Sequence, residues 1–449
     1  MDFKGKKVLV CGMARSGQSA AALLCDLGAN VTAQDLNENI KWAYNPFAKG
    51  MALYLGQNPD KIIHEFDLVV ISPGLSIYLP FIEKARELGI PVWGETELAF
   101  RLCPCPVIGI TGTNGKTTVT TLVGEILKLH NPKTIVAGNI GIPLTSLVQG
   151  LTPDGYVVAE ISSFQLETAV DFKPNISAVL NMTPDHLDRH RNMETYIQMK
   201  ARIFQNQRHP DIAVLNYDNP ITQAMKPPCG VMWFSESTQL EKGVCLWDGS
   251  IYAGGQHIVS LEGLNIIAEN ALAATALALS AGVPIEHIAA GIRAFRVVPH
   301  RLEHVASIGG VEYFNDSKAT NPNAAIKALE SIKKPIVLIG GGYDKDADFT
   351  PWVEAFHGKV TQLILIGQTA PKIIEICKEK GFAPYQEAKT MEEAVEMATS
   401  LATHGQAVLL SPACASFDMF KDFEERGDVF RQMIKDIENE GKLCDANTE

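Results

Sequence analysis

The strongest chemical signal in the sequence is the glycine-rich stretch GTNGKTT, which follows the apolar run Val107–Thr111. Glycines at positions 112 and 115 allow backbone N–H groups to turn inward around phosphate oxygens. Lys116 would place a positive charge on the terminal phosphates, and the Thr117 hydroxyl would bind Mg²⁺. The stretch is a variant of the usual phosphate loop, because Ile110 stands where the motif has its first glycine. Its whole length is expected to surround the phosphates of a nucleoside triphosphate: Gly112, Thr113, Asn114, Gly115, Lys116, Thr117 and Thr118.

Acidic and imidazole side chains follow two further apolar runs. Glu160 ends the run Tyr156-Val-Val-Ala-Glu160, where a phosphate-loop enzyme places a second metal ligand. The stretch NMTPDHLDRH, at positions 181–190, clusters Asp185, His186, Asp188 and His190 with a spacing that does not fit a closed zinc site. A solvated turn with helix-capping aspartates is an equally good interpretation of this second cluster.

Lys200 lies in a stretch expected to be helical, Met193–Phe204. A single lysine in a helix is typical of a surface charge, and its pattern alone indicates no function.

Two more glycine-rich turns follow apolar runs. Gly12-Met-Ala-Arg-Ser-Gly17 precedes an expected helix and has Asp35 about 20 residues further on, which resembles a dinucleotide fingerprint. Its spacing differs from G-x-G-x-x-G, so it favours a site for a nucleotide diphosphate or ribose more than one for NAD. Ser72-Pro73-Gly74 would line the same edge. The turn that ends in Lys345 can equally be a tight turn with no function.

The elements that must position these residues alternate between strand and helix in three successive sections. The first section has expected strands at 7–11, 30–34, 68–72 and 91–93, with a helix at 16–27. The second has strands at 107–111, 134–137, 156–161, 178–181 and 212–216, and helices at 117–127 and 265–282. Residues 230–261 predict a small antiparallel meander. The third has strands at 312–315, 336–339, 363–366 and 407–410, with a helix at 390–403.

These sections predict an α/β protein of three domains. A Rossmann-like domain at 1–94 would carry the site for a nucleotide diphosphate or ribose. A central phosphate-loop domain with a small antiparallel β element at 95–299 would bind ATP. A Rossmann-like domain at 300–449 would follow.

Bulk composition narrows the class of partner. The net charge is −12 and there is no run of Lys or Arg, which argues against a protein that tracks nucleic-acid phosphates. The longest apolar stretch, 271–282, is too short for a bilayer. The nine cysteines are scattered, which indicates reduced thiols and a cytoplasmic protein. We expect small-molecule substrates, no nucleic acid, no membrane and a monomer.

Taken together, these motifs resemble the Mur ligases of peptidoglycan synthesis over essentially the whole chain. The resemblance rests on GTNGKTT, on AEISSFQL at 159–166, on NMTPDHLDRH and on VPHRLE at 298–303. NDSKATNP at 315–322 and LSPACASFDMFKDF at 410–423 are similar to the branch of the family that adds D-glutamate.

The resemblance implies a role for particular residues. Lys116, His186 and Lys200 would be catalytic, and two Mg²⁺ ions would be held by Thr117, Glu160, His186 and Lys200. Lys200 matches a lysine that CO₂ converts to a carbamate in this family, which would turn a cation into an anionic metal ligand. ATP would also contact Asn270, Arg301, Asp316 and Lys318. D-glutamate would contact Thr320, Lys345, Ser416 and Phe423. The UDP-sugar would contact Arg15, Ser16, Asp35, Pro73, Gly74 and Asn139.

One stretch departs from the family pattern. The family has His-Asn-x-x-Asn before its alanine-rich helix, whereas Ile267 stands here at the position of the first asparagine. Asn270 keeps the second position, and Asn265 would replace the first if the local register shifts.

The chemistry that the resemblance implies is ligation of a carboxylate to an amine through an acyl phosphate. A folylpolyglutamate-type ligase shares a related loop but gives no reason for the first domain. An NAD-dependent dehydrogenase leaves the phosphate loop unexplained. A non-catalytic nucleotide-binding regulator is a third alternative.

Overall fold

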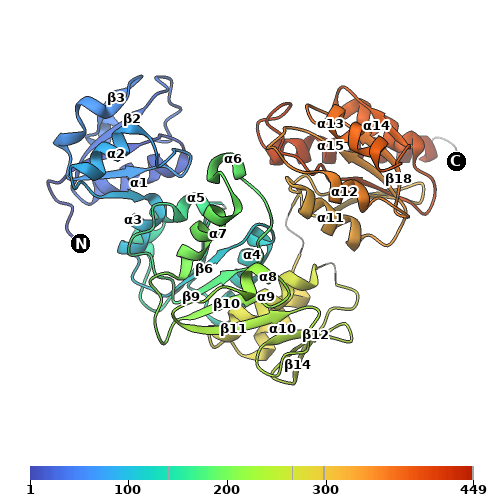
Figure 1. The fold of residues 1–449 in the computed structure, drawn as a ribbon, viewed down its shortest axis with the longest axis horizontal. Coiled ribbons are helices and arrows are strands. Elements are labelled where there is room, and N and C mark those ends of the chain that lie inside the picture. The colour runs from blue at the N-terminus through green and yellow to red at the C-terminus, as the bar shows by residue number, and fades with distance from the viewer. Residues whose placement is uncertain (140, 265, 297–298, 447–449) are drawn as a thin grey trace. The chain divides into compact units, whose positions relative to one another are not determined.

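The computed structural model describes residues 1–139, 141–264, 266–296 and 299–446 (Figure 1). The chain divides into two compact units, each with its own core. The first unit comprises 1–182 and 194–295, and the second comprises 183–193 and 296–449. Among the described residues, no helix is long and apolar enough to cross a membrane.

The N-terminal part of the first unit is built on a parallel sheet of five strands in the order β3-β2-β1-β4-β5. The chain reverses its direction of winding between β1 and β4, which creates the crevice where such sheets bind ligands. The predicted strands are confirmed, and β3 adds a strand that the pattern missed. The elements are β1 (Lys7–Cys11), α1 (Arg15–Asp26), β2 (Asn30–Asp35), β3 (Ala52–Leu55), β4 (Leu68–Ile71), α2 (Pro80–Glu87), β5 (Val92–Gly94) and α3 (Glu95–Leu102).

The remainder of the first unit surrounds a sheet of nine strands in the order β14-β13-β12-β11-β10-β9-β6-β8-β7. The strands are β6 (Val107–Thr111), β7 (Thr134–Gly138), β8 (Tyr156–Glu160), β9 (Ile176–Val179), β10 (Ile212–Asn216), β11 (Gly230–Ser235), β12 (Val244–Trp247), β13 (Ser250–Ala253) and β14 (Gln256–Ser260). The helices are α4 (Lys116–His130), α5 (Ser163–Leu166), α7 (Met193–Ala201), α8 (Pro220–Gln223), α9 (Ala268–Ser280) and α10 (Ile285–Ala294).

The meander expected at 230–261 differs in one strand. β11 pairs parallel with both β10 and β12, so it continues the parallel sheet. Only the pairs β12–β13 and β13–β14 of this stretch are antiparallel, as their short connections allow. The short runs broken by glycine indicated tight turns correctly, but they do not specify the direction of a strand that enters by a longer connection.

Helix α9 explains why the central sheet can hold the phosphate loop firmly. Its alanines and leucines are buried almost throughout and pack with α4 and α10 in one apolar core. Small side chains allow these helices to approach closely. The loop at the start of α4 therefore stands on a densely packed base.

The second unit contains a sheet of six strands in the order β15-β16-β20-β17-β18-β19, in which β15 alone is antiparallel to its neighbour. The strands are β15 (Glu303–Ile308), β16 (Val311–Asn315), β17 (Ile336–Gly340), β18 (Val360–Leu365), β19 (Tyr385–Glu387) and β20 (Ala407–Leu410). The helices are α6 (Leu187–His190), α11 (Pro322–Ser331), α12 (Thr350–Glu354), α13 (Ala370–Glu379), α14 (Met391–Leu401) and α15 (Phe423–Ala446).

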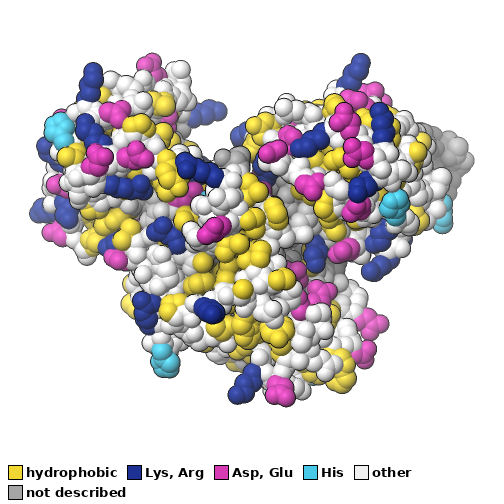
Figure 2. All heavy atoms as spheres, in the orientation of Figure 1, with side chains coloured by type: hydrophobic (Ala, Val, Ile, Leu, Met, Phe, Trp, Pro, Cys, Tyr) yellow, Lys and Arg dark blue, Asp and Glu magenta, His cyan; other side chains and the backbone are white. Residues whose placement is uncertain are grey.

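Successive residues of β17 serve opposite faces of this sheet. Ile336 and Leu338 pack with α11, α12 and α13, whereas Val337 and Ile339 pack with α14 and α15. Helices on both faces of a mostly parallel sheet confirm the predicted α/β class. On the face shown in Figure 2, acidic and basic side chains are interspersed over each unit.

Candidate active site

The phosphate loop connects β6 to α4 through two glycines with left-handed backbone angles, Gly112 (φ +154°) and Gly115 (φ +81°). A side chain at 115 would overlap the Oδ1 atom of Asn270, which therefore lies directly against the loop. Glycine is required there by both the backbone angle and the close approach. The N-terminus of α4 begins at Lys116, so its free N–H groups follow the turn.

Asn181, which follows the neighbouring strand β9, fixes the shape of the loop. The amide of Asn114 donates to Asn181 Oδ1 at 2.8 Å, and the amide of Thr113 donates to the Asn181 carbonyl at 3.0 Å. Asn181 Nδ2 in turn donates to Glu269 Oε1 at 2.7 Å. Lys116 Nζ donates to the carbonyls of Gly112 and Thr113, at 3.0 and 2.7 Å, so the lysine lies over its own loop.

Glu160 ends β8, the strand beside β6, and its register partner is Ile110. Its side chain is 2% exposed. Oε1 accepts a hydrogen bond from Asn139 Nδ2 at 2.7 Å, whereas Oε2 is buried and has no hydrogen-bond partner in the described structure. A buried carboxylate oxygen without a donor is costly, and a hard cation such as Mg²⁺ would satisfy it. The donor set therefore fits Mg²⁺.

Within the described ranges, no group of three His, Cys, Asp or Glu side chains could hold a metal ion. A protein cage of that kind is not what Mg²⁺ needs, because Mg²⁺ usually keeps waters and takes phosphate oxygens beside one or two protein ligands. Thr117, buried at the start of α4, and Glu160 are ligands of that type.

Lys200 is buried rather than a surface charge, so the interpretation that its helical pattern favours is wrong. It is 2% exposed, and its Nζ donates to the Gly112 carbonyl at 2.8 Å. Nζ also lies 4.9 Å from the centroid of the Tyr196 ring, and the Tyr196 hydroxyl is 3.2 Å from Thr113 Oγ1. Helix α7 therefore presents Lys200 to the phosphate loop.

The glycine-rich turn after β1 is closed by side chains of neighbouring strands. Asp35, at the end of β2, accepts the Met13 amide at 2.6 Å. A side chain at Gly12 would lie 2.9 Å from Ser72 Cβ, and one at Gly17 would overlap the Gly12 carbonyl. Both glycines are thus required by close packing, and Pro73 and Gly74 follow Ser72 directly in the chain.

The other residues predicted to bind the UDP-sugar lie in two places. Arg15 is exposed and Ser16 half-buried at the start of α1, on the crevice of the first sheet. Asn139 follows β7 and contacts Glu160, in the central part of the unit.

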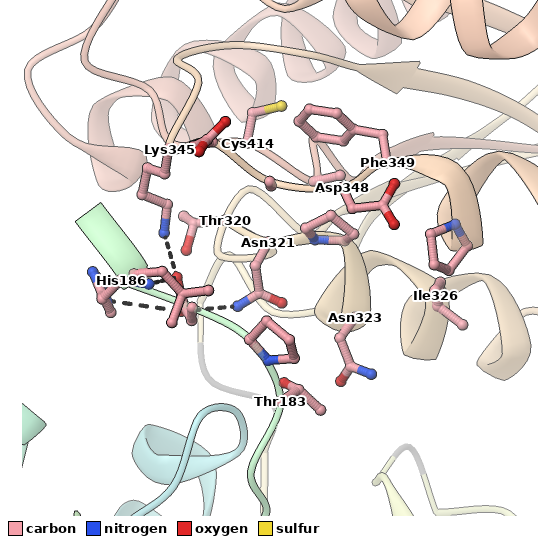
Figure 3. A pocket seen from close by; sticks show the side chains of 18 of the residues that line it. Thr183, His186, Thr320, Asn321, Asn323, Ile326, Lys345, Asp348, Phe349 and Cys414 are labelled. Carbon is pink, nitrogen blue, oxygen red and sulfur yellow. Dashed lines mark hydrogen bonds and ion pairs between the residues drawn. The ribbon is translucent and has the colours of Figure 1, made fainter. Parts of the chain in front are cut away.

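The second unit contains a cavity of about 330 Å³ that Thr320 and Lys345 help to line (Figure 3). Lys345 Nζ is 2.9 Å from Asp185 Oδ1, and Asn321 Nδ2 donates to Asp185 Oδ2 at 3.3 Å. Asp185 also accepts the amide of His186, whose backbone is left-handed at φ +54°. The segment 183–193 thus brings Asp185 and His186 to the wall of this cavity. The solvated-turn interpretation is wrong for Asp185, whose side chain is 9% exposed.

The residues predicted to contact the nucleotide from the second unit surround Asp316. This carboxylate is 3% exposed and accepts the Leu302 amide at 3.1 Å and the Ser411 hydroxyl at 2.9 Å. Burial raises the pKa of Asp316 to about 6, against the opposing charge of Arg301 and these hydrogen bonds. Lys318 Nζ lies 5.0 Å from the centroid of the Phe423 ring, so those two predicted residues lie together.

Ser416 is buried, and its hydroxyl has no hydrogen-bond partner in the described parts of the chain. A hydroxyl in that state is available to a ligand. Asn265 and the segment Val297–Val298, which the sequence patterns singled out, lie outside the described residues.

Sequence reasoning missed several buried charged side chains, of which Glu97, Glu95 and Arg426 join segments that lie far apart in the sequence. Glu97 accepts the amides of Val170, Asp171 and Phe172 at 2.9 to 3.0 Å, which ties α3 to the segment between α5 and β9. Glu95 accepts the amide and hydroxyl of Thr145, and burial raises the pKa of Glu95. Arg426 is the third. Their partners are distant in sequence, so no local pattern signals them.

These features define a class of protein: an α/β enzyme with a phosphate loop for ATP, a carboxylate and a buried lysine beside that loop, and a separate cavity with a lysine in the last section of the chain. Three family models match the chain in order. They are described as Mur ligase MurD-like N-terminal domain at 6–94, Mur ligase middle domain at 110–278, and Mur ligase glutamate ligase domain at 300–414.

The chain belongs to the Mur ligase family, as its motifs predicted. It is 44% identical to the UDP-N-acetylmuramoylalanine–D-glutamate ligase of Caldanaerobacter subterraneus subsp. tengcongensis, with 97% of this chain and 100% of that protein covered. The enzyme of the same name from Thermoanaerobacter sp. strain X514 is 45% identical, with the same coverage.

Solved structures support the fold. UDP-N-acetylmuramate-alanine ligase MurC from Thermotoga maritima matches with a TM-score of 0.61 at 19% identity, covering 96% of this chain and 99% of that one. MurF ligase from the same organism, in complex with ADP, matches with a TM-score of 0.60 at 15% identity, covering 96% of each chain. The predicted three-domain α/β architecture is confirmed.

Proposed function

We propose that this chain is the ATP-dependent ligase that adds D-glutamate to UDP-N-acetylmuramoyl-L-alanine in peptidoglycan precursor synthesis. The observation that carries the proposal is the phosphate loop at the head of α4, with Glu160 and Lys200 buried beside it. Relatives that match over the full chain carry the name of this reaction. NDSKATNP and LSPACASFDMFKDF, the stretches that resemble the D-glutamate branch, follow adjacent strands β16 and β20.

The reaction needs ATP because a carboxylate has no leaving group that an amine can displace. The carboxylate of the alanyl group attacks the γ-phosphate, ADP departs, and an acyl phosphate forms. The amine of D-glutamate then attacks the acyl carbon, and phosphate leaves with both electrons of the C–O bond. Both steps concentrate negative charge on oxygen, so fixed positive groups are what the protein must supply.

Lys116 and the N-terminus of α4 are the fixed positive groups that we assign to the phosphates. Lys116 Nζ donates to the loop carbonyls of Gly112 and Thr113. We expect it to exchange these carbonyls for phosphate oxygens, a short movement that leaves the loop unchanged. Asn270, against Gly115, would limit where the nucleotide lies.

We assign Thr117 and Glu160 to Mg²⁺, because the buried Oε2 atom of Glu160 has no hydrogen-bond donor in the described structure and a cation would satisfy it. Bound there, the ion would neutralise phosphate charge during transfer. His186 is proposed as a ligand of a second Mg²⁺ on the family resemblance alone. Asn139, which holds the other oxygen of Glu160, would orient that carboxylate.

Lys200 is proposed to carry a carbamate formed with CO₂. Its amine is buried at the phosphate loop, where a cation would compete with Mg²⁺ and an anion would bind it. ¹³C NMR of protein equilibrated with ¹³C-bicarbonate tests this directly: a carbamate signal is expected in the wild type and absent in K200A. Equal spectra would overturn the assignment.

The remaining residues are assigned by position. Thr320, Lys345, Ser416 and Phe423 would bind D-glutamate, and Arg301, Asp316 and Lys318 would bind the nucleotide. Arg15, Ser16, Asp35, Pro73, Gly74 and Asn139 would bind the UDP-sugar. We also propose domain limits at 1–94, 95–299 and 300–449, activity as a monomer, and a cytoplasmic reaction, where ATP is available.

The test is phosphate release from ATP with Mg²⁺, bicarbonate and UDP-N-acetylmuramoyl-L-alanine, with D-glutamate, L-glutamate or no amino acid. Release that requires both the UDP-sugar and D-glutamate is expected. Release with a different amino acid would move the protein to another branch of the family. No turnover under these conditions would favour a nucleotide-binding regulator.

A further inference from the structure

Arg426, in helix α15, is a buried cation surrounded by neutral acceptors. It is 1% exposed. Its Nε donates to Ser317 Oγ at 2.9 Å, and its Nη2 donates to the carbonyls of Ser317 and Cys414 at 2.8 and 3.1 Å. Its Nη1 donates to the Ala415 carbonyl at 3.1 Å. Within the part of the chain that the structure describes, no carboxylate forms an ion pair with it.

This arrangement is costly for the fold. A charge removed from water needs an opposite charge or a complete set of hydrogen bonds, and apolar residues of the same size often serve stability better. Burial lowers the pKa of Arg426 to about 10, although the charges of Asp418 and Asp316 act in the opposite direction. Stability alone therefore does not explain an arginine at this position.

The guanidinium lies where three loops converge. Ser317 follows β16, Cys414 and Ala415 follow β20, and a side chain added at Gly342, which follows β17, would lie 3.2 Å from Nη1. These three strands are neighbours in the sheet and run parallel, so their carboxyl ends form one edge. Ligands of such sheets bind at that edge.

The loops that Arg426 joins carry residues assigned above to substrates. Ser317 lies between Asp316 and Lys318, and Ala415 precedes Ser416, whose buried hydroxyl has no hydrogen-bond partner in the described structure. The planar fork of an arginine can hydrogen-bond to both loops at once. Nε and Nη2 donate to Ser317 in the loop after β16, and Nη1 and Nη2 donate to Ala415 and Cys414 in the loop after β20.

We propose that Arg426 is a positioning residue for the ligation reaction: it fixes the loop after β20 against the loop after β16, so that Ser416 meets D-glutamate in the required place. Arg426 itself touches no substrate. The inference rests on the proposed function, because the D-glutamate role of Ser416 belongs to it.

The test compares R426K, R426M and S317A with the wild type in the phosphate-release assay. K435M is the matched control, because Lys435 is an exposed cation on the same helix. For each folded protein, kcat and the separate KM values for D-glutamate and the UDP-sugar are measured, with the melting temperature. A lysine keeps the charge but cannot serve both loops, so R426K should raise the KM for D-glutamate about fivefold, the equivalent of about one lost hydrogen bond.

R426M should raise this KM further, to tenfold or more at roughly 1.4 kcal/mol per decade, and S317A should raise it by a smaller factor. The KM for the UDP-sugar, whose assigned residues lie in the first unit, should stay within about twofold, because a lost contact acts on the ligand that it positions. A purely structural role would lower the melting temperature and the active fraction and leave both KM values unchanged.

Unchanged KM values in folded R426K and S317A would therefore overturn the inference, even if R426M fails to fold. Equal increases in both KM values would also overturn it. A wild-type protein without D-glutamate-dependent release would instead overturn the proposed function, and this inference with it.

Discussion

Asp316 is a buried carboxylate whose ionisation should lower the free energy of unfolding of the second unit. Burial raises its pKa from 3.8 to about 6. The folded state therefore binds the proton more tightly than the unfolded state, and stability must fall as pH rises from about 4 to about 6. At about 1.4 kcal/mol for each pH unit, the ionised carboxylate costs the fold about 3 kcal/mol above pH 6.

Substitution D316N should remove that cost without a change of shape. The amide oxygen can still accept the Leu302 amide, and the Ser411 hydroxyl can rotate to accept from the new NH₂ group. At pH 8 we expect D316N to be more stable than the wild type by up to about 3 kcal/mol, and at pH 4 the difference should approach zero. Activity should be lost, since Asp316 is assigned to the nucleotide.

Chemical denaturation of both proteins, followed by circular dichroism between pH 4 and pH 8, measures the difference in free energy of unfolding. D436N is the control, because Asp436 is an exposed carboxylate on α15 and its amide should change stability by less than about 0.5 kcal/mol. A difference between D316N and the wild type that does not vary with pH would refute the reasoning, as would a D316N protein that is less stable at pH 8.

Three further substitutions test other parts of the structure. G115A should lower the free energy of unfolding by about 1–2 kcal/mol, because the backbone at 115 is left-handed. It should also raise the KM for ATP strongly, because the new methyl group overlaps Asn270. An ATP titration that matches the wild type would contradict this. E97Q should lower the free energy of unfolding by about 2–3 kcal/mol, since the amide oxygen that remains cannot accept all the N–H groups that the carboxylate holds; an unchanged unfolding midpoint would argue against it. K345M should raise the KM for D-glutamate by tenfold or more through loss of a charged hydrogen bond, with the KM for the UDP-sugar unchanged. Kinetics equal to those of K378M, a substitution of an exposed lysine of α13, would remove Lys345 from the amino-acid site.

Local patterns predicted the strands that carry the chemistry. β1, β6, β10 and β20 match their expected bounds, because continuous apolar runs that end in glycine or a polar turn are typical of buried parallel strands. β3, β15 and β19 were missed, and all three are partly exposed and lie at or near sheet edges, where the apolar signal is weak.

The helical pattern around Lys200 was the clearest failure of local reasoning. A lysine among Tyr196, Gln198 and Met199 has the same spacing whether it faces water or a phosphate loop. Only the family resemblance pointed to its role, and the burial of its amine against Gly112 depends on how α7 packs on the end of β6.

What the sequence determined by itself is local. It determined the phosphate loop, whose glycines, lysine and threonines lie within seven consecutive residues. It also determined the α/β alternation, because the spacing of apolar residues in a strand or a helix is visible within about ten residues. The tertiary structure decided which charges meet. Asp185 pairs with Lys345 across 160 positions, and Arg426 joins loops that begin at Ser317 and Cys414. Such contacts depend on the order of strands in the sheet, and strand order is set by long-range packing that no spacing along the chain records.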